Sequence, residues 1–277
     1  MELVFILFLI AAGLFAGFMA GLLGIGGGFI FAPAMFFVLK SCGVPEETAI
    51  LVAFGTSLAC AFPTILTGAV THIKQGNVSV KNAVVMGLCG AVLSAFGAVC
   101  AGFLPVKVLT ILFGCLLIAG AVRLVTKLPS GEKQQMRVLP CVCTGSAAGF
   151  FSGLLGVGGG TIIVPLLTIA GRFSMKRAVG TSSLAIVFIT FGGIFSYLCT
   201  GFASGADLSA WGFCAFGFIE LWMWLILVIC AVPAAFLSSR YLSGKIPDNA
   251  LRWMFFVLMI LIALQMFGVF ELIAGIV

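Results

Sequence analysis

The sequence predicts an all-α integral membrane protein made of two inverted-topology repeats, each with five helical elements and with broken helices at glycine-rich motifs. Three observations predict it: the composition, a duplicated motif and the placement of the basic residues. Of the 277 residues, 62% are apolar and 8% are charged, whereas a soluble domain has roughly 25% charged residues. So few charges cannot cover a water-facing surface, which excludes a cytosolic enzyme, a nucleic-acid-binding protein and a disordered scaffold.

A glycine-rich motif occurs twice and defines the repeats. Gly21–Pro33 (GLLGIGGGFIFAP) and Gly153–Pro165 (GLLGVGGGTIIVP) are identical at nine of 13 positions, at an offset of 132 residues. Further along the chain, Ala53–Ser57 (AFGTS) matches Ala178–Ser182 (AVGTS) at an offset of 125 residues. Two motifs that recur in the same order indicate a duplicated membrane unit.

Each repeat is expected to contain five helical elements. In the first membrane repeat, residues 1–126, they lie at 3–20, 28–40, 48–72, 80–103 and 106–126. After a charged linker at 127–137, the second membrane repeat, residues 138–277, has them at 138–152, 160–171, 176–200, 220–239 and 249–273. The apolar run at 3–20 has no basic segment before it, so we expect a first membrane segment and not a cleaved signal peptide.

The glycine motifs are expected to break their helices. About 20 apolar residues are needed to cross the hydrocarbon core of a bilayer, and the elements at 28–40 and 160–171 are too short to do so. The element at 138–152, before the second glycine run, is short as well. We therefore expect the chain to turn back at each motif, toward the side from which it entered.

The basic residues predict the orientation. With the linker in the cytoplasm, 12 of the 14 Lys and Arg residues lie on the cytoplasmic side and only Lys40 and Lys107 lie outside, as the positive-inside rule requires. Both termini are then extracytoplasmic, and the glycine motifs enter the cell (plasma or inner) membrane from opposite faces. Inverted repeats with paired broken helices are typical of secondary transporters, which bind substrate near the midplane between the repeats.

The glycine runs are the first candidate substrate-binding residues: Gly26, Gly27 and Gly28, and Gly158, Gly159 and Gly160. Non-helical backbone inside a membrane is tolerated only where it lines a cavity or is buried in protein. The amide groups at the start of the helix after each run favour an anion. The alternative is that these glycines only let helices pack closely. Their duplication in inverted halves favours a site for a small anion.

Hydroxyl side chains in the second motif are further candidates for binding the substrate: Thr56, Ser57, Thr181, Ser182 and Ser183. A hydroxyl can donate a hydrogen bond to an oxyanion without adding fixed charge. The alternative is a hydrogen bond back to the carbonyl group one turn earlier in the same helix. A set of neutral donors suits a small anion that must also be released.

Three other residues are singled out by their type. Pro33 and Pro165 each follow the third glycine of a run by five residues and are expected to kink their helices. His72 is the single histidine of the chain, and it is either a proton-coupling group or a polar residue at the membrane interface. It aligns with Tyr197, so the second repeat does not duplicate it.

Groups for catalysis or metal binding are missing from the sequence. Glu220, which aligns with Ser79 in a looser match of residues 76–89 with 217–230, is expected to be a helix N-terminal charge and not a buried acid. The chain has no P-loop and no Cys/His cluster with metal-ligand spacing. We expect no metal, no cofactor, no enzymatic activity and no nucleic-acid partner. The expected partners are a small anionic substrate and the lipid bilayer, and the oligomeric state is not predicted.

The paired motifs GLLG[IV]GGGxIxxP and AxGTS resemble those of the sulfite exporter TauE/SafE family, also called TSUP or DUF81, over nearly the whole chain. The resemblance implies a permease that moves small organosulfur compounds or sulfur oxyanions, such as sulfite or sulfonates, usually outward. It assigns the site to the glycines and prolines named above and to Thr56, Ser57, Thr181 and Ser182. It does not extend to Ser183, because the first repeat has Leu58 at that position, so the two half-sites are not equivalent. We therefore expect a secondary transporter that works by alternating access around a midplane anion site. A channel-like or structural membrane subunit, and a carrier for a different small solute, stay open as alternatives.

Overall fold

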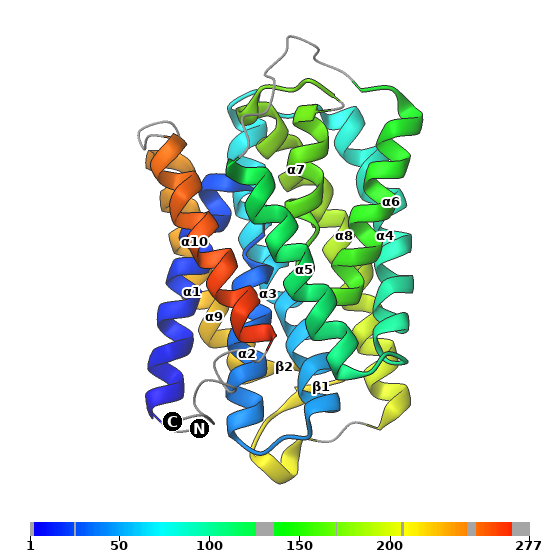
Figure 1. Cartoon of the computed structure of the whole chain (residues 1–277), viewed down its shortest axis with the longest axis vertical. Coiled ribbons are helices and arrows are strands. Elements are labelled where there is room, and N and C mark those ends of the chain that lie inside the picture. Colours follow the sequence, from blue (N-terminus) through cyan, green and yellow to red (C-terminus); the bar gives the residue numbers. More distant parts are fainter. Residues whose placement is uncertain are drawn as a thin grey trace.

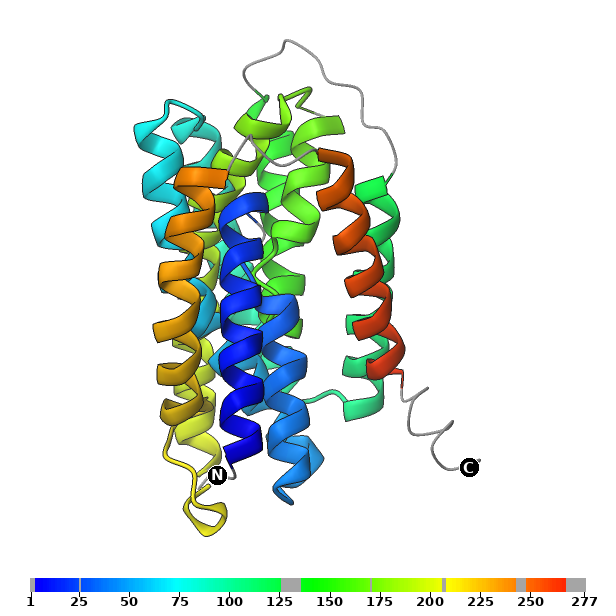
Figure 2. The same ribbon diagram turned by 90° about the vertical axis from the view of Figure 1, so that its left-hand side faces the viewer.

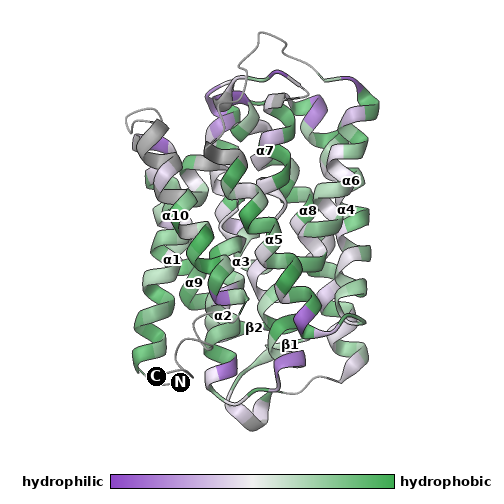
Figure 3. Ribbon diagram, in the orientation of Figure 1, coloured by the Kyte–Doolittle hydropathy of each residue, from purple (hydrophilic) through white to green (hydrophobic). Residues whose placement is uncertain are grey.

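The computed structural model describes residues 3–24, 26–125, 136–169, 171–205, 208–242 and 248–267. Most of them form helices along the long axis of the molecule (Figures 1 and 2). Within these residues, six helices are long and apolar enough to cross a membrane. Hydrophobic residues cover the middle of the helices, and hydrophilic residues gather toward their ends (Figure 3). The predicted class, an all-α integral membrane protein, is confirmed.

The helices follow the predicted order, with bounds that agree to within about one turn. The first half contains α1 (Leu3–Leu23), α2 (Gly28–Ser41), α3 (Glu46–Lys74), α4 (Val80–Ala101) and α5 (Val106–Val125). The second half contains α6 (Val138–Leu155), α7 (Gly160–Ile169), α8 (Met175–Ser204), α9 (Leu221–Leu237), a π-helix η2 (Ser238–Leu242) and α10 (Asp248–Met266). Most of the linker, at 127–135, and the end of the last expected element, at 268–273, lie outside the described residues.

Two features differ from the sequence expectation. A 3₁₀ turn η1 (Ser209–Trp211) and a hairpin of β1 (Ala215–Phe216) and β2 (Ile219–Glu220) precede α9. In addition, α6 is not short, because it continues for 18 residues and is long enough to cross a membrane. It ends only at Gly156, whose φ of 67° lies in the left-handed region.

The helices break at both glycine runs, as the sequence predicts. Within the two motifs, the glycines with positive φ are Gly24, Gly26 and Gly27 after α1, and Gly156, Gly158 and Gly159 after α6. Residues with a Cβ atom rarely adopt this conformation, so each run determines where its helix must stop. Beyond the breaks, α2 occupies the lower half of the molecule and α7 the upper half (Figure 1).

Helices of each half pack against helices of the other half. Helix α1 packs against α9, and α6 packs against α4. A Cβ atom at Gly17 of α1 would lie 2.2 Å from the carbonyl oxygen of Ala231, and one at Gly149 of α6 would lie 2.1 Å from that of Gly90. Such glycines let membrane helices approach closely. These residue pairs correspond under the sequence alignment of the repeats, whereas the inverted placement of the repeats in a bilayer stays a prediction.

Candidate functional site

The two glycine breaks lie against each other in the interior. The described residues of both runs are buried, and a Cβ atom at Gly28 would lie 2.7 Å from the carbonyl oxygens of Gly156 and Val157. Segments 132 residues apart in sequence therefore share one buried region. This arrangement has no room for a side chain at Gly28.

Each break ends at the N-terminus of a short helix with the same geometry. The carbonyl oxygen of Gly27 accepts hydrogen bonds from the amides of Ile30 and Phe31, at 3.0 and 3.1 Å. The carbonyl oxygen of Gly159 accepts them from Ile162 and Ile163, at 3.1 Å each. The first amides of a helix have no partner within that helix, and the helix dipole favours negative charge there. Both breaks thus end in a buried, electropositive helix terminus.

Ser57 connects the two breaks. Its hydroxyl group lies 3.1 Å from the carbonyl oxygen of Gly28 and 2.8 Å from that of Gly156, and it donates to both. Ser182, its counterpart in the second repeat, donates to the carbonyl oxygen of Gly24 at 3.3 Å and to that of Val179 in its own helix at 2.9 Å. Each serine therefore holds the break of the other half.

The remaining predicted hydroxyl groups also have protein partners. Thr56 accepts a hydrogen bond from the amide of Glu220 at 2.9 Å, and Thr181 accepts one from the amide of Ser79 at 3.0 Å. These two contacts correspond under the alignment of the repeats. Ser183 donates to the carbonyl oxygen of Val179, four residues earlier, which is the alternative considered from the sequence. All five hydroxyl residues are fully buried, and their contact with substrate stays a prediction.

Three buried hydroxyl groups that the sequence did not single out have no hydrogen-bond partner among the described residues: Ser94, Ser152 and Thr161. Ser152 lies at the second break, since a Cβ atom at Gly159 would be 3.5 Å from its Cβ. The corresponding residues of the first repeat are Ala20 for Ser152 and Phe29 for Thr161. A search of the aligned repeats for polar residues that replace apolar ones would have identified Ser152 and Thr161.

Glu220 is both a charge at a helix N-terminus and a buried acid, which are alternatives in the expectation from the sequence. It is the N-cap residue immediately before α9, and its carboxylate accepts a hydrogen bond from the amide of Met223, as expected. The carboxylate is also fully buried, which corrects the expectation that Glu220 is not a buried acid. The reason is the hairpin, which folds back so that the amide of Cys214 also donates to this carboxylate. Burial raises the pKa of Glu220, and the backbone hydrogen bonds lower it in part.

His72 and the two prolines lie within helices. The His72 side chain is 3% exposed, and neither ring nitrogen has a hydrogen-bond partner among the described residues. It packs beside Gly180, where a Cβ atom would lie 3.1 Å from that of His72. Pro33 lies inside α2 and Pro165 inside α7. In the described part of the chain, no three His, Cys, Asp or Glu residues gather to hold a metal ion.

The comparisons with known proteins agree with the motifs. The sequence matches the family described as "Sulfite exporter TauE/SafE" over residues 9–266. The chain belongs to this family. A "probable membrane transporter protein" of Methanocaldococcus jannaschii is 31% identical over 249 residues, which cover 89% of each chain. A protein with the same description from Haemophilus influenzae is 30% identical over 95% of this chain and 98% of its own. The protein is therefore a multi-pass membrane transporter of the TauE/SafE family.

Proposed function

We propose that the protein is a secondary transporter that exports small sulfur-containing anions, such as sulfite or organosulfonates. It works by alternating access around a buried site where the two glycine breaks meet. The family supports the substrate class, because its description names sulfite export. The observation that carries the proposal is the contact of Gly28 with Gly156 and Val157, which brings two electropositive helix termini into one buried region.

The anion binds at the second break, at the N-terminus of α7. Ser152 supplies a buried hydroxyl donor beside Gly159, and Thr161 carries a second one in the first turn of α7; neither has a partner among the described residues. An unpaired buried hydroxyl is costly, and a bound oxyanion would satisfy it. The first break has Ala20 and Phe29 at the matching positions. These side chains have no hydrogen-bond donor, so only the second break offers hydroxyl groups to an anion. Neutral donors bind an oxyanion without holding it as tightly as a fixed positive charge would.

Alternating access follows from the exchanged hydrogen bonds. Ser57 has one hydroxyl proton for two carbonyl oxygens on different breaks, and Ser182 divides its proton between Gly24 and its own helix. When the breaks move relative to each other, one bond of each pair can lengthen while the other is kept. Each serine hydroxyl then keeps an acceptor in both the inward-open and the outward-open state. The two states can therefore have similar energies, as alternating access between repeats requires.

The orientation is proposed from the basic residues. The linker, on the cytoplasmic side with most of the Lys and Arg residues, leaves both termini outside. Lys74, at the end of α3, and Arg240, in η2 directly after α9, lie on the cytoplasmic side in this arrangement. Labelling of single cysteines in intact cells, at residue 130 in the linker and near each terminus, tests the proposed sides.

Transport is tested with the purified protein in liposomes. A carrier should give saturable uptake of labelled sulfite and counterflow against unlabelled sulfite inside, and a methanesulfonate competitor should reduce both. Flux without saturation and without counterflow would favour the channel-like alternative. Equal flux of a neutral compound of similar size, such as dimethyl sulfone, would favour a carrier for another solute. We propose no catalysis, so the recovered sulfite should be chemically unchanged.

A further inference from the structure

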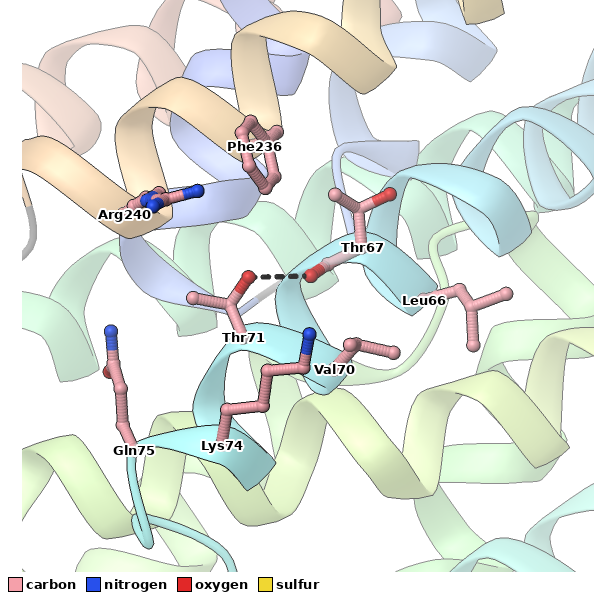
Figure 4. A pocket seen from close by; sticks show the side chains of 8 residues that line it. All are labelled: Leu66, Thr67, Val70, Thr71, Lys74, Gln75, Phe236 and Arg240. Atoms are coloured by element: carbon pink, nitrogen blue, oxygen red, sulfur yellow. Dashed lines mark hydrogen bonds between the residues drawn. The ribbon is translucent and has the colours of Figure 1, made fainter.

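A basic cavity lies away from the glycine breaks, between the C-terminal part of α3 and the junction of α9 with η2 (Figure 4). Its volume is about 600 Å³. Two cationic side chains line it, Lys74 from α3 and Arg240 from η2, together with the polar side chains of Thr67, Thr71 and Gln75. Figure 4 shows Lys74 on α3 and Arg240 on the neighbouring helix among the side chains that line the cavity.

The charges of this cavity are not neutralised within the described chain. The ion pair among the described residues is Lys40–Glu46, at 3.0 Å on a different pair of helices. The guanidinium group of Arg240 lies 5.6 Å from the ring centre of Phe236 and 5.5 Å from that of Tyr241. Stacking of this kind holds the charge in place without removing it. Two positive charges from different helices therefore face one cavity.

The hydroxyl groups of Thr67 and Thr71 cannot donate hydrogen bonds to a ligand in this cavity. Thr71 donates to the carbonyl oxygen of Thr67 at 2.9 Å, and Thr67 donates to that of Pro63 at 2.9 Å. Their protons are thus used within α3, and their oxygens can only accept. Lys74 and Arg240 are the groups that would bind a negatively charged ligand.

The cavity opens beside side chains that would face lipid. Leu66, Val70 and Phe236 line it and are 40%, 43% and 39% exposed. Lys74 is the last residue of a span of 29 residues, and Arg240 lies one residue before the end of another. Both cations are therefore at the level of lipid headgroups, with apolar surface extending from them toward the membrane core. Basic pockets of this kind between spanning helices bind anionic headgroups.

We infer that this cavity binds the headgroup of an anionic membrane phospholipid, with the phosphate between Lys74 and Arg240. The acyl chains then lie along Leu66, Val70 and Phe236. A free oxyanion shares the phosphate chemistry and could use the same two charges. The exposed apolar flank favours the lipid, because a free anion would leave that surface uncovered. This inference does not depend on which substrate the protein transports.

The test compares lipid retention by the full chain and its variants. Delipidated protein is titrated with phosphatidylglycerol or phosphatidylcholine, bound lipid is counted by native mass spectrometry, and thermal stability is measured in parallel. Wild type should retain phosphatidylglycerol and be stabilised by it more than by phosphatidylcholine. The double variant Lys74→Gln/Arg240→Gln should bind phosphatidylglycerol about thirtyfold more weakly.

Two further variants keep the result interpretable. Lys107→Gln/Lys176→Gln removes the same net charge from exposed lysines elsewhere and should retain the lipid. Lys74→Arg/Arg240→Lys keeps both charges and should retain it as well, whereas loss of lipid there would mean a disturbed fold. Equal retention by wild type and the Gln double variant would overturn the inference. So would displacement of the lipid by free phosphate or sulfite at millimolar concentration, because the cavity would then be a site for soluble anions.

Discussion

Ser57 on α3 donates a 2.8 Å hydrogen bond to the carbonyl oxygen of Gly156, at the break of the other repeat. Ser182 on α8 makes the corresponding bond to Gly24 at 3.3 Å. These two contacts cross between the halves, and Ser57 also donates to the carbonyl oxygen of Gly28 at the break of its own repeat. Movement of one half relative to the other must therefore change the hydrogen bonding at both breaks at once. This coupling is the physical basis of the transport mechanism proposed above.

Removal of the Ser57 hydroxyl group should weaken both breaks. In Ser57→Ala, two buried carbonyl oxygens lose their donor, which costs about 1–3 kcal/mol of stability and should slow transport. The measurements are thermal unfolding and sulfite counterflow. Thr64→Ala on the same helix, which loses only a bond to the carbonyl oxygen of Cys60, should transport normally. Equal loss of counterflow in both variants would mean that the hydrogen bond from Ser57 to the other repeat is not specifically required for transport.

A methyl group at Gly28 should block the contact between the breaks. In Gly28→Ala, the added Cβ would lie 2.7 Å from the carbonyl oxygens of Gly156 and Val157, so the backbones must separate. We expect loss of transport while the protein still inserts in the membrane. Gly68→Ala in α3 meets nothing within 4 Å and should behave as wild type. Retained transport by Gly28→Ala would show that close approach of the breaks is not needed.

Ser152 should affect substrate binding more than stability. Its hydroxyl group has no partner among the described residues, so Ser152→Ala removes no hydrogen bond within that part of the protein. A lost hydrogen bond to a charged ligand is worth about 1.5–3 kcal/mol, and KM for sulfite should rise by at least about tenfold. Ser196→Ala is the reverse control, because it removes a 2.8 Å bond to the carbonyl oxygen of Ala95. That variant should lose stability and keep its KM.

The buried carboxyl group of Glu220 should make stability depend on pH. Its pKa is raised above the ordinary value of 4.5, mainly by burial, so the folded protein holds this proton when the unfolded chain has released it. Stability should therefore fall as the pH rises from about 4.5 through the folded pKa. Unfolding temperatures of wild type and Glu220→Gln, measured across this range, should show the fall only in wild type.

A matched variant isolates the contribution of Glu220. Glu47→Gln changes an exposed acid in the first turn of α3 and should keep the pH dependence of wild type. If Glu220→Gln shows the same fall in stability as wild type, another group is responsible for it.

The fold was largely predictable because apolar runs and glycine runs act locally. The length of each apolar run indicated the helices, and three consecutive glycines located both breaks. The hairpin before α9 was not predictable, since strands of two residues have no recognisable periodicity. The burial of Glu220 depends on that hairpin, and for this reason the sequence alone indicated its capping role but not its environment.

The candidate site was predictable only in part. The repeated glycines and hydroxyl residues indicated a shared region, but the partner of each hydroxyl group depends on which helices of the other half it meets. Ser57 could equally have bonded within its own helix, as Ser183 does. Ser152 was missed because it is not duplicated: Ala20 stands at its position in the first repeat. Ser152 becomes a candidate for substrate binding only in the structure, where its hydroxyl group has no hydrogen-bond partner among the described residues.

The proposed mechanism depends on an oxyanion that binds at the second glycine break. Crystals of the protein soaked with selenite, a heavier analogue of sulfite, would locate the anion by the anomalous scattering of selenium. We predict an anomalous peak beside Ser152 and Gly159 at the N-terminus of α7, with lower occupancy in Ser152→Ala. A peak found solely elsewhere, such as between Lys74 and Arg240, with none at the break would contradict the account.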